Sequence, residues 1–195
     1  HNPTGADLSA AQWGEVVEAC RARGLVPFLD MAYQGFSDGI DTDAVAVRAF
    51  SASGLQFFVS SSFSKSFSLY GERVGALTIV TAGKEESARV MSQLKRVIRT
   101  NYSNPPIHGG ALVATVLASP ELRQMWETEL AGMRDRIRAM RTGLVDAIKA
   151  QGVTQDFSFV VQQRGMFSYT GLTAAQVERM KDEFGIYAVS TGRIC

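Results

Sequence analysis

The sequence from residue 57 to residue 67 is Phe57-Phe58-Val59-Ser60-Ser61-Ser62-Phe63-Ser64-Lys65-Ser66-Phe67. Its first three residues form an apolar run that is typical of a buried β-strand. A serine-rich segment with a single lysine follows at once, so hydroxyl groups and a cation come directly after the strand. In α/β proteins ligands bind at the carboxyl ends of strands, and this segment is therefore the first candidate for a binding site.

The segments on either side predict a layer of alternating helices and strands. Ser9 and Gln12 have the spacing of a capping box, and apolar residues then recur at helical spacing as far as Gly24. Further buried strands are predicted at residues 25–29, ending at Asp30, and at residues 74–80, with a helix around residues 45–50. This order predicts an α/β fold with a mostly parallel sheet.

The second half of the chain has a different pattern. A helix of roughly 30 residues is predicted from Ser119-Pro120 onward, and such a helix is long enough to connect two domains. Three strand-like stretches follow, at residues 157–161, 166–169 and 186–189, with a second capping box at Thr173 and Gln176. These features indicate a smaller α+β unit after the long helix.

The composition argues against nucleic-acid binding and against a membrane protein. Charged residues make up 20% of the chain and the formal net charge is +1. The densest basic stretch, four arginines within residues 134–141, alternates with apolar residues and is interpreted as a solvated helix face. No apolar run reaches the roughly 18 residues of a membrane span. Cys20 and Cys195 are expected to be free thiols in a reducing cytoplasm, and no metal site is expected.

Lys65 has the sequence neighbours of a reactive amine. A lysine nucleophile must lose its proton at neutral pH, and burial or a neighbouring cation promotes that loss. Arg73 could supply the cation and could also bind a phosphate with its planar guanidinium. By spacing alone, the segment fits equally well a polar loop that holds an ordinary exposed lysine.

Several motifs, in the same order and spacing, resemble those of the aspartate and aromatic aminotransferases, which are fold-type-I pyridoxal-phosphate enzymes. They are His1-Asn2-Pro3-Thr4-Gly5, Asp30-Met31-Ala32-Tyr33-Gln34-Gly35-Phe36, Ser62-Phe63-Ser64-Lys65, Gly71-Glu72-Arg73-Val74-Gly75, Asn101-Tyr102-Ser103-Asn104-Pro105-Pro106, Gly165-Met166-Phe167-Ser168 and Ser190-Thr191-Gly192-Arg193. The resemblance implies that residues 1–132 are the C-terminal half of a cofactor-binding large domain with α/β/α layers. Residues 133–195 would be most of a small α+β domain, truncated at its C-terminus.

The resemblance implies pyridoxal 5'-phosphate as the cofactor. Lys65 would carry the cofactor and move a proton at the substrate Cα. Asp30 would pair with the protonated pyridine nitrogen, which keeps the ring able to accept electrons. Considered alone, Asp30 is explained as well by a strand-end turn or a helix cap.

The other cofactor-binding residues follow from the same resemblance. Asn2 and Tyr33 would donate hydrogen bonds to the phenolic oxygen of the cofactor. Ser62, Ser64 and Arg73 would hold the phosphate, with charge-assisted bonds from the guanidinium. A turn before proline, a buried ring and an ordinary serine loop are the structural alternatives for these positions.

Two arginines match the substrate-binding residues of the family. Arg193 resembles the arginine that binds the substrate α-carboxylate. Arg99 resembles the arginine that reaches the partner subunit's site and meets a side-chain carboxylate, which implies a homodimer. The alternatives are a surface arginine at a strand end and one more cation on a helix that also holds Lys95 and Arg96.

The implied activity is transamination between an aromatic or dicarboxylic amino acid and a 2-oxo acid, with glutamate and 2-oxoglutarate as one pair. Residues 67–71 and 163–172 and the closing Arg193-Ile194-Cys195 look closer to bacterial aromatic-amino-acid aminotransferases than to strict aspartate enzymes. A strict aspartate aminotransferase, or a relative with other chemistry on the same cofactor, is the alternative. A non-enzymatic relative would be expected to lack Lys65 or Asp30. Because parts of the family's site lie outside this sequence, the chain by itself is expected to be inactive.

Overall fold

The computed structural model describes residues His1–Cys195, which form two compact units. The sheet unit comprises Leu8–Gly35 and Gly39–Glu129, and the C-terminal unit comprises His1–Asp7, Phe36–Asp38 and Leu130–Cys195. The division falls within helix α5 (Pro120–Ala150), the same helix that contains residues 132 and 133. Two short segments from early in the chain thus belong to the C-terminal unit.

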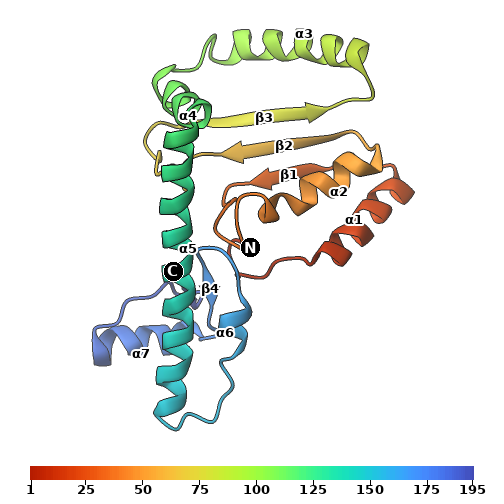
Figure 1. The fold of residues 1–195 in the computed structure, drawn as a ribbon. Helices are drawn as coiled ribbons and strands as arrows, with labels where there is room; N and C mark the ends of the chain where they lie inside the picture. The colour runs from red at the N-terminus through yellow and green to blue at the C-terminus, as the bar shows by residue number, and fades with distance from the viewer. The chain divides into compact units, whose positions relative to one another are not determined.

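The sheet unit contains a three-stranded sheet in the order β1-β2-β3 (Figure 1). Strands β1 (Phe28–Met31) and β2 (Phe57–Ser62) are parallel, whereas β3 (Gly75–Val80) pairs with β2 in the antiparallel direction. Within these three strands the expectation of a mostly parallel sheet holds for the first pairing and fails for the second. A parallel crossover usually contains a helix, and residues 63–74, which join β2 to β3, contain none.

The core of the sheet unit joins this sheet to helices α1 (Ala10–Arg23) and α2 (Val45–Ser53), the second of which follows a short 3-10 turn at Thr42–Ala44. The buried residues of the cluster are Val17, Phe50, Phe57 and Val59. The rings of Phe50 and Phe57 lie with their centroids 5.6 Å apart. Both predicted helices are confirmed, and so is the strand that begins at Phe57.

Both ends of α1 agree with the sequence. Ser9 Oγ accepts a hydrogen bond from the Gln12 amide at 3.3 Å, and Gln12 Oε1 accepts one from the Ser9 amide at 2.9 Å. Gly24 ends the helix with a φ of 62°, in the left-handed region where glycine carries no steric penalty.

The strand predicted at residues 25–29 begins later than expected. The Leu25 amide donates to the Cys20 carbonyl at 2.9 Å, so this residue still belongs to the end of α1. Pro27 has no N–H to donate to a ladder, and β1 begins at Phe28. Leu25 and Val26 are 52% and 64% exposed, so the prediction that they are buried is also wrong.

Helices α3 (Lys84–Asn101) and α4 (His108–Ala118) lie between β3 and α5 along the chain. Helix α5 starts at Pro120, whose missing N–H suits the first turn of a helix. Its 31 residues confirm the predicted long helix. None of the helices combines the length and the apolar character that crossing a membrane would require.

The C-terminal unit differs from the sequence prediction in two places. Residues 157–161 were predicted as a strand, but Phe159–Gln162 form the short helix α6, after a turn in which the Asp156 carboxylate accepts bonds from Ser158. The strand predicted at 186–189 is absent, because the Ile186 amide bonds to the Met180 carbonyl at the end of α7 (Ala174–Phe184).

The rest of the C-terminal unit follows the sequence more closely. Strand β4 (Ser168–Tyr169) lies within the predicted stretch 166–169, and it pairs in the antiparallel direction with β5 (Arg193–Ile194). The predicted capping box of α7 is present, with Thr173 and Gln176 exchanging hydrogen bonds. Arg193 is therefore held in a strand pair, directly opposite Tyr169.

We expect Phe50→Ala to lower the free energy of unfolding of the full-length protein by about 3–5 kcal/mol, because it removes a 1%-exposed ring from the core. Phe50→Leu, which keeps most of the buried volume, should cost clearly less. Urea titration followed by circular dichroism measures both. Equal losses for the two variants would show that the cavity left at residue 50 does not determine the effect.

Candidate active site

Lys65 lies in a tight turn directly after β2. The Ser64 amide donates to Ser62 Oγ at 3.2 Å, and the Ser68 amide donates to the Lys65 carbonyl at 3.1 Å. Ser64 and Ser66, on either side of the lysine, are buried at 5% and 7% exposure. The backbone around Lys65 is therefore fixed, while its side chain remains half-buried.

The amine of Lys65 lies between two tyrosine rings. Its Nζ atom is 5.3 Å from the centroid of the Tyr33 ring and 5.5 Å from that of Tyr70. Aromatic faces attract a cation at such distances. The structure therefore places Lys65 beside Tyr33, another candidate site residue, and beside Tyr70, for which no role was predicted.

Asp30 is brought to the same edge of the sheet by the parallel pairing of β1 and β2. In this register Asp30 lies opposite Ser60, and Met31 lies opposite Ser61. The Ser60 hydroxyl donates to Asp30 Oδ1 at 3.3 Å. Since both strands end at this edge, Asp30 and the segment that carries Lys65 emerge on the same side.

Arg73 lies near this edge because it comes just before β3, which begins here. Gly75 pairs with Ser62, and a side-chain carbon at Gly75 would lie only 2.8 Å from the Ser61 carbonyl oxygen, so the strands approach closely there. Arg73 has a φ of 53°, and its Nη1 donates to the Tyr70 carbonyl at 3.0 Å. The predicted phosphate-binding residues Ser62 and Arg73 are thus at neighbouring strand ends.

Trp126, on α5, contacts the turn that carries Lys65. Its Nε1–H donates to the Ser66 carbonyl at 2.6 Å, and its ring stacks on Phe67 with centroids 4.4 Å apart. Sequence reasoning treated Trp126 only as one apolar position of the long helix. Its contact with a residue adjacent to Lys65 depends on how α5 packs, which its spacing could not indicate.

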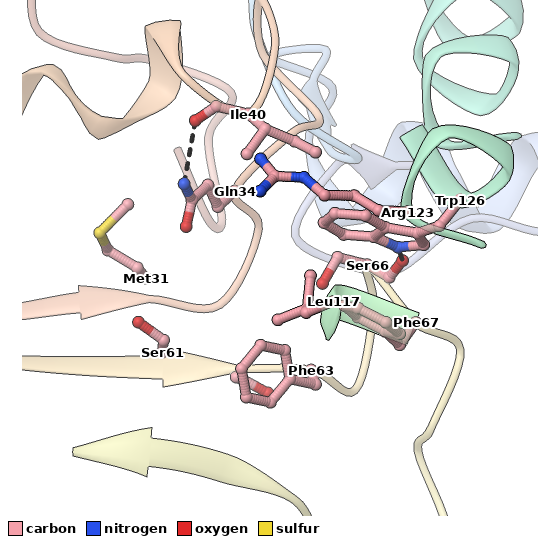
Figure 2. Close-up of a pocket in the computed structure, with 11 residues that line it drawn as sticks. Met31, Gln34, Ile40, Ser61, Phe63, Ser66, Phe67, Leu117, Arg123 and Trp126 are labelled. Atoms are coloured by element: carbon pink, nitrogen blue, oxygen red, sulfur yellow. Dashed lines mark hydrogen bonds between the residues drawn. The ribbon is translucent and has the colours of Figure 1, made fainter. Parts of the chain in front are cut away.

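A cavity of about 250 Å³ adjoins this turn, and Figure 2 shows the side chains around it. It is lined by Met31, Gln34, Ile40, Ser61, Ser62, Phe63, Ser66, Phe67, Leu117, Arg123 and Trp126. Neither Lys65 nor Asp30 is among the lining residues. The cavity therefore borders the candidate site without containing its reactive groups.

In the C-terminal unit, Asn2 lies in a turn that packs against residues 163–167. The Gly5 amide donates to the His1 carbonyl at 2.7 Å, and the Arg164 amide donates to the Gly5 carbonyl at 2.7 Å. Gly165 has a φ of 78°, and a side-chain carbon there would collide with the His1 ring, so glycine suits this position. The position of Asn2 thus depends on the loop at residues 163–167.

Arg193 lies over an aromatic ring of the same loop. Its guanidinium carbon is 4.5 Å from the centroid of the Phe167 ring. The Thr170 hydroxyl and amide both donate to the carbonyl of Gly192, at 2.8 and 3.0 Å. A guanidinium that is held over a ring keeps a fixed orientation, which suits it to a bidentate bond with a carboxylate.

Arg141 corrects the interpretation of residues 134–141 as a solvated face. It is only 7% exposed and donates to Ser168 Oγ and to the carbonyls of Gln163, Gly165 and Phe167. Burial lowers the pKa of its guanidinium, and Arg164 and Arg138 lower it further. The alternation of basic and apolar residues identified a helix but not which arginine faces the interior.

Arg99 lies in the last turn of α3, where its side chain is exposed. Its Nη1 donates to the Ser103 hydroxyl just beyond the helix. The contacts within this chain therefore leave the guanidinium accessible to solvent at the end of an exposed helix.

Comparison with known proteins assigns the family. The model of the family described as aminotransferase class I and II matches residues 1–195. The chain is 69% identical to the aspartate aminotransferase of Pseudomonas aeruginosa and 51% identical to the aromatic-amino-acid aminotransferase of Escherichia coli, in each case over all of this chain and 49% of the relative.

A solved structure agrees with these sequence relatives. The aromatic-amino-acid aminotransferase of Burkholderia pseudomallei, which is covalently bound to pyridoxal phosphate, is 72% identical, with a TM-score of 0.98 over all of this chain and 49% of that one. The chain thus spans about half the length of the relatives it matches. It belongs to the class I and II aminotransferases.

Proposed function

We propose that this chain supplies the cofactor-bearing lysine of a pyridoxal-phosphate-dependent aminotransferase that uses aromatic or dicarboxylic amino acids and 2-oxo acids. The observation that carries the proposal is the placement of Lys65 between the rings of Tyr33 and Tyr70, on the turn that leaves β2. Glutamate and 2-oxoglutarate form one substrate pair. The Burkholderia relative supports the choice of cofactor, since it binds pyridoxal phosphate covalently.

The groups of the sheet unit fit the chemistry of pyridoxal phosphate. The amine of Lys65 suits the aldehyde, the carboxylate of Asp30 suits the pyridine nitrogen, and the phenol of Tyr33 suits the ring oxygen. The phosphate is suited by two hydroxyls and a guanidinium, those of Ser62, Ser64 and Arg73. When bound, the cofactor supplies an acceptor for the electrons released at the substrate Cα. Asn2, in the C-terminal unit, is the second donor proposed for the ring oxygen.

Asp30 holds a proton on the pyridine nitrogen. Its carboxylate is already oriented by the hydroxyl of Ser60, at 3.3 Å. An ionised carboxylate has four lone-pair sites, so this bond leaves Asp30 able to accept another from a protonated nitrogen. A carboxylate at this point keeps the ring cationic and therefore able to accept electrons.

Lys65 takes the proton from the substrate Cα. The protonated amine formed in that step is stabilised by the faces of Tyr33 and Tyr70, each contributing about 0.5–2 kcal/mol. Because the turn around Lys65 is fixed by Ser64 and Ser66, the amine moves only through its own side-chain torsions. This restricted freedom keeps the base close to the carbon it serves.

Ser62, Ser64 and Arg73 hold the phosphate. Ser62 Oγ accepts the bond from the Ser64 amide, which leaves the Ser62 O–H as a donor. Arg73 adds charge-assisted hydrogen bonds from the next strand end. The guanidinium offsets one negative charge of the phosphate, and the hydroxyls donate hydrogen bonds to its oxygens.

Substrate binding uses the two remaining arginines. Arg193 binds the α-carboxylate that every substrate carries, and Arg99 meets the side-chain carboxylate of a dicarboxylic substrate in the partner subunit of a cytoplasmic homodimer. The sheet unit is proposed as the C-terminal half of a three-layer large domain and the residues from 133 onward as a small domain. Relatives named for aspartate and for aromatic amino acids are both close, so strict aspartate specificity is the second candidate.

Borohydride reduction of the full-length holoenzyme is expected to fix the cofactor on the peptide that contains Lys65. Lys65→Ala should abolish the label, whereas Lys84→Ala, at the exposed start of α3, should leave it unchanged. Peptide mass spectrometry measures the result. A label that remains in the Lys65→Ala protein, on another lysine, would contradict the assignment.

Asp30→Asn is expected to reduce transamination by several orders of magnitude, because a neutral pyridine ring is a poor electron acceptor. Cofactor absorbance should remain, since the phosphate-binding residues are intact. Ser60→Ala, which removes only the bond that orients the carboxylate, should cause a smaller loss. Single-turnover rates should fall in the order wild type, Ser60→Ala, Asp30→Asn. Near-normal turnover of Asp30→Asn would contradict the role proposed for this residue.

Arg99→Leu is expected to depress kcat/KM for aspartate and glutamate far more than for phenylalanine or tyrosine. Arg96→Leu, which removes an equally exposed cation from the same helix, is the matched control and should change neither. Equal losses on both substrate classes would remove Arg99 as the side-chain anchor. A wild-type enzyme that uses aspartate but neither phenylalanine nor tyrosine would instead support strict aspartate specificity.

A further inference from the structure

Arg141 is a buried cation whose hydrogen bonds all go to neutral acceptors. Its Nε donates to Ser168 Oγ at 2.8 Å, and its Nη2 donates to the carbonyls of Gly165 and Phe167 at 2.6 and 2.8 Å. Its Nη1 donates to the Gln163 carbonyl at 3.2 Å. A buried guanidinium is costly unless its N–H groups are hydrogen-bonded, so these bonds favour the one loop conformation that supplies all four acceptors.

The three carbonyl acceptors lie in the loop 163–167, which connects α6 with β4, and the fourth acceptor, Ser168, is the first residue of β4. The loop has other attachments as well. The side chain of Gln163 exchanges bonds with the backbone of Tyr169, the Arg164 amide bonds to Gly5, and the Arg164 guanidinium pairs with Asp38. Arg141 adds four hydrogen bonds from a single side chain and so ties the loop and the start of β4 to the long helix α5.

The loop in turn supports the group proposed to bind the substrate α-carboxylate. Phe167, whose carbonyl accepts a bond from Arg141, places its ring 4.5 Å from the guanidinium carbon of Arg193. Ser168, bonded to Arg141 through its hydroxyl, pairs with Ile194 in the β4–β5 ladder, next to Arg193. Both routes from Arg141 thus end at Arg193, one through a ring face and one through the strand pair.

We propose that Arg141 is a positioning residue that sets the orientation of Arg193 for the substrate α-carboxylate, an inference that rests on the proposed aminotransferase function. The neighbouring charges are consistent with this role. Arg138 and Arg164 share the carboxylate of Asp38, so the charge of Arg141 is left to the loop carbonyls. The uncompensated positive charge also favours an anionic ligand in this unit.

A purely structural role would have a different signature. If Arg141 only stabilised the fold, its loss would reduce the amount of folded enzyme but would leave the affinity of the folded fraction for carboxylates unchanged. If Arg141 orients Arg193, carboxylate affinity falls in the folded fraction. The loss is the same for every amino acid, because the α-carboxylate is common to all of them.

The test uses the full-length holoenzyme with Arg141→Met, Arg141→Lys and Ser168→Ala, and Arg136→Met as the control, since Arg136 is an exposed arginine of the same helix. Calorimetry measures the Kd of 3-phenylpropionate, a carboxylate without an amine. We expect about a 10- to 100-fold higher Kd for Arg141→Met, the scale on which a small misplacement of a binding group acts. Smaller increases are expected for Arg141→Lys and Ser168→Ala, and none for Arg136→Met.

Two further measurements complete the test. KM should rise by the same factor for aspartate and phenylalanine, with the active fraction measured by titration of bound cofactor, and cofactor affinity should not change. An unchanged Kd for 3-phenylpropionate in folded Arg141→Met overturns the proposal, as does an equal loss of cofactor binding. If Arg141→Met does not fold, the milder Arg141→Lys and Ser168→Ala proteins decide. A wild-type protein that binds no cofactor would instead refute the aminotransferase proposal.

Discussion

The parallel pairing of β1 with β2 determines where the reactive groups of the sheet unit lie. It sets Asp30 opposite Ser60, and it sends the segments that carry Tyr33 and Lys65 out of the sheet at the same edge. A shift of one residue would turn the Asp30 side chain to the other face, since side chains alternate along a strand. The buried core that includes Phe50 and Phe57 favours this register, because a shift of one residue would move the buried side chains of β2 to the other face.

The C-terminal unit is organised by a different kind of interaction. Its strands β4 and β5 are only two residues each, too short to define a register through the ladder alone. Side-chain bonds to the backbone take over this function, from Arg141 to the loop carbonyls and from Thr170 to Gly192. The cofactor groups proposed in the sheet unit therefore depend on strand pairing, whereas Arg193 and Asn2, in the C-terminal unit, depend on a loop held by guanidinium–carbonyl bonds.

What the sequence could predict follows from how local each signal is. The capping boxes at Ser9 and Thr173 and the apolar run at Phe57 depend on a few adjacent residues, and all three are confirmed. The site motifs could be recognised because residues with specific chemistry recur at fixed spacing. The antiparallel β3, the strand at Arg193–Ile194 and the burial of Arg141 depend on partners distant in the chain, and no local pattern carries that information.

The contact between Trp126 and the lysine turn has an optical consequence. The chain contains two tryptophans, Trp13 against the core of the sheet unit and Trp126 hydrogen-bonded to the residue that follows Lys65. An indole so close to the lysine is an intrinsic donor for resonance energy transfer to a chromophore attached there that absorbs where indole emits. Its emission would report the occupancy of the site without an added dye, and Trp13 would provide a second, separately placed emitter in the same unit.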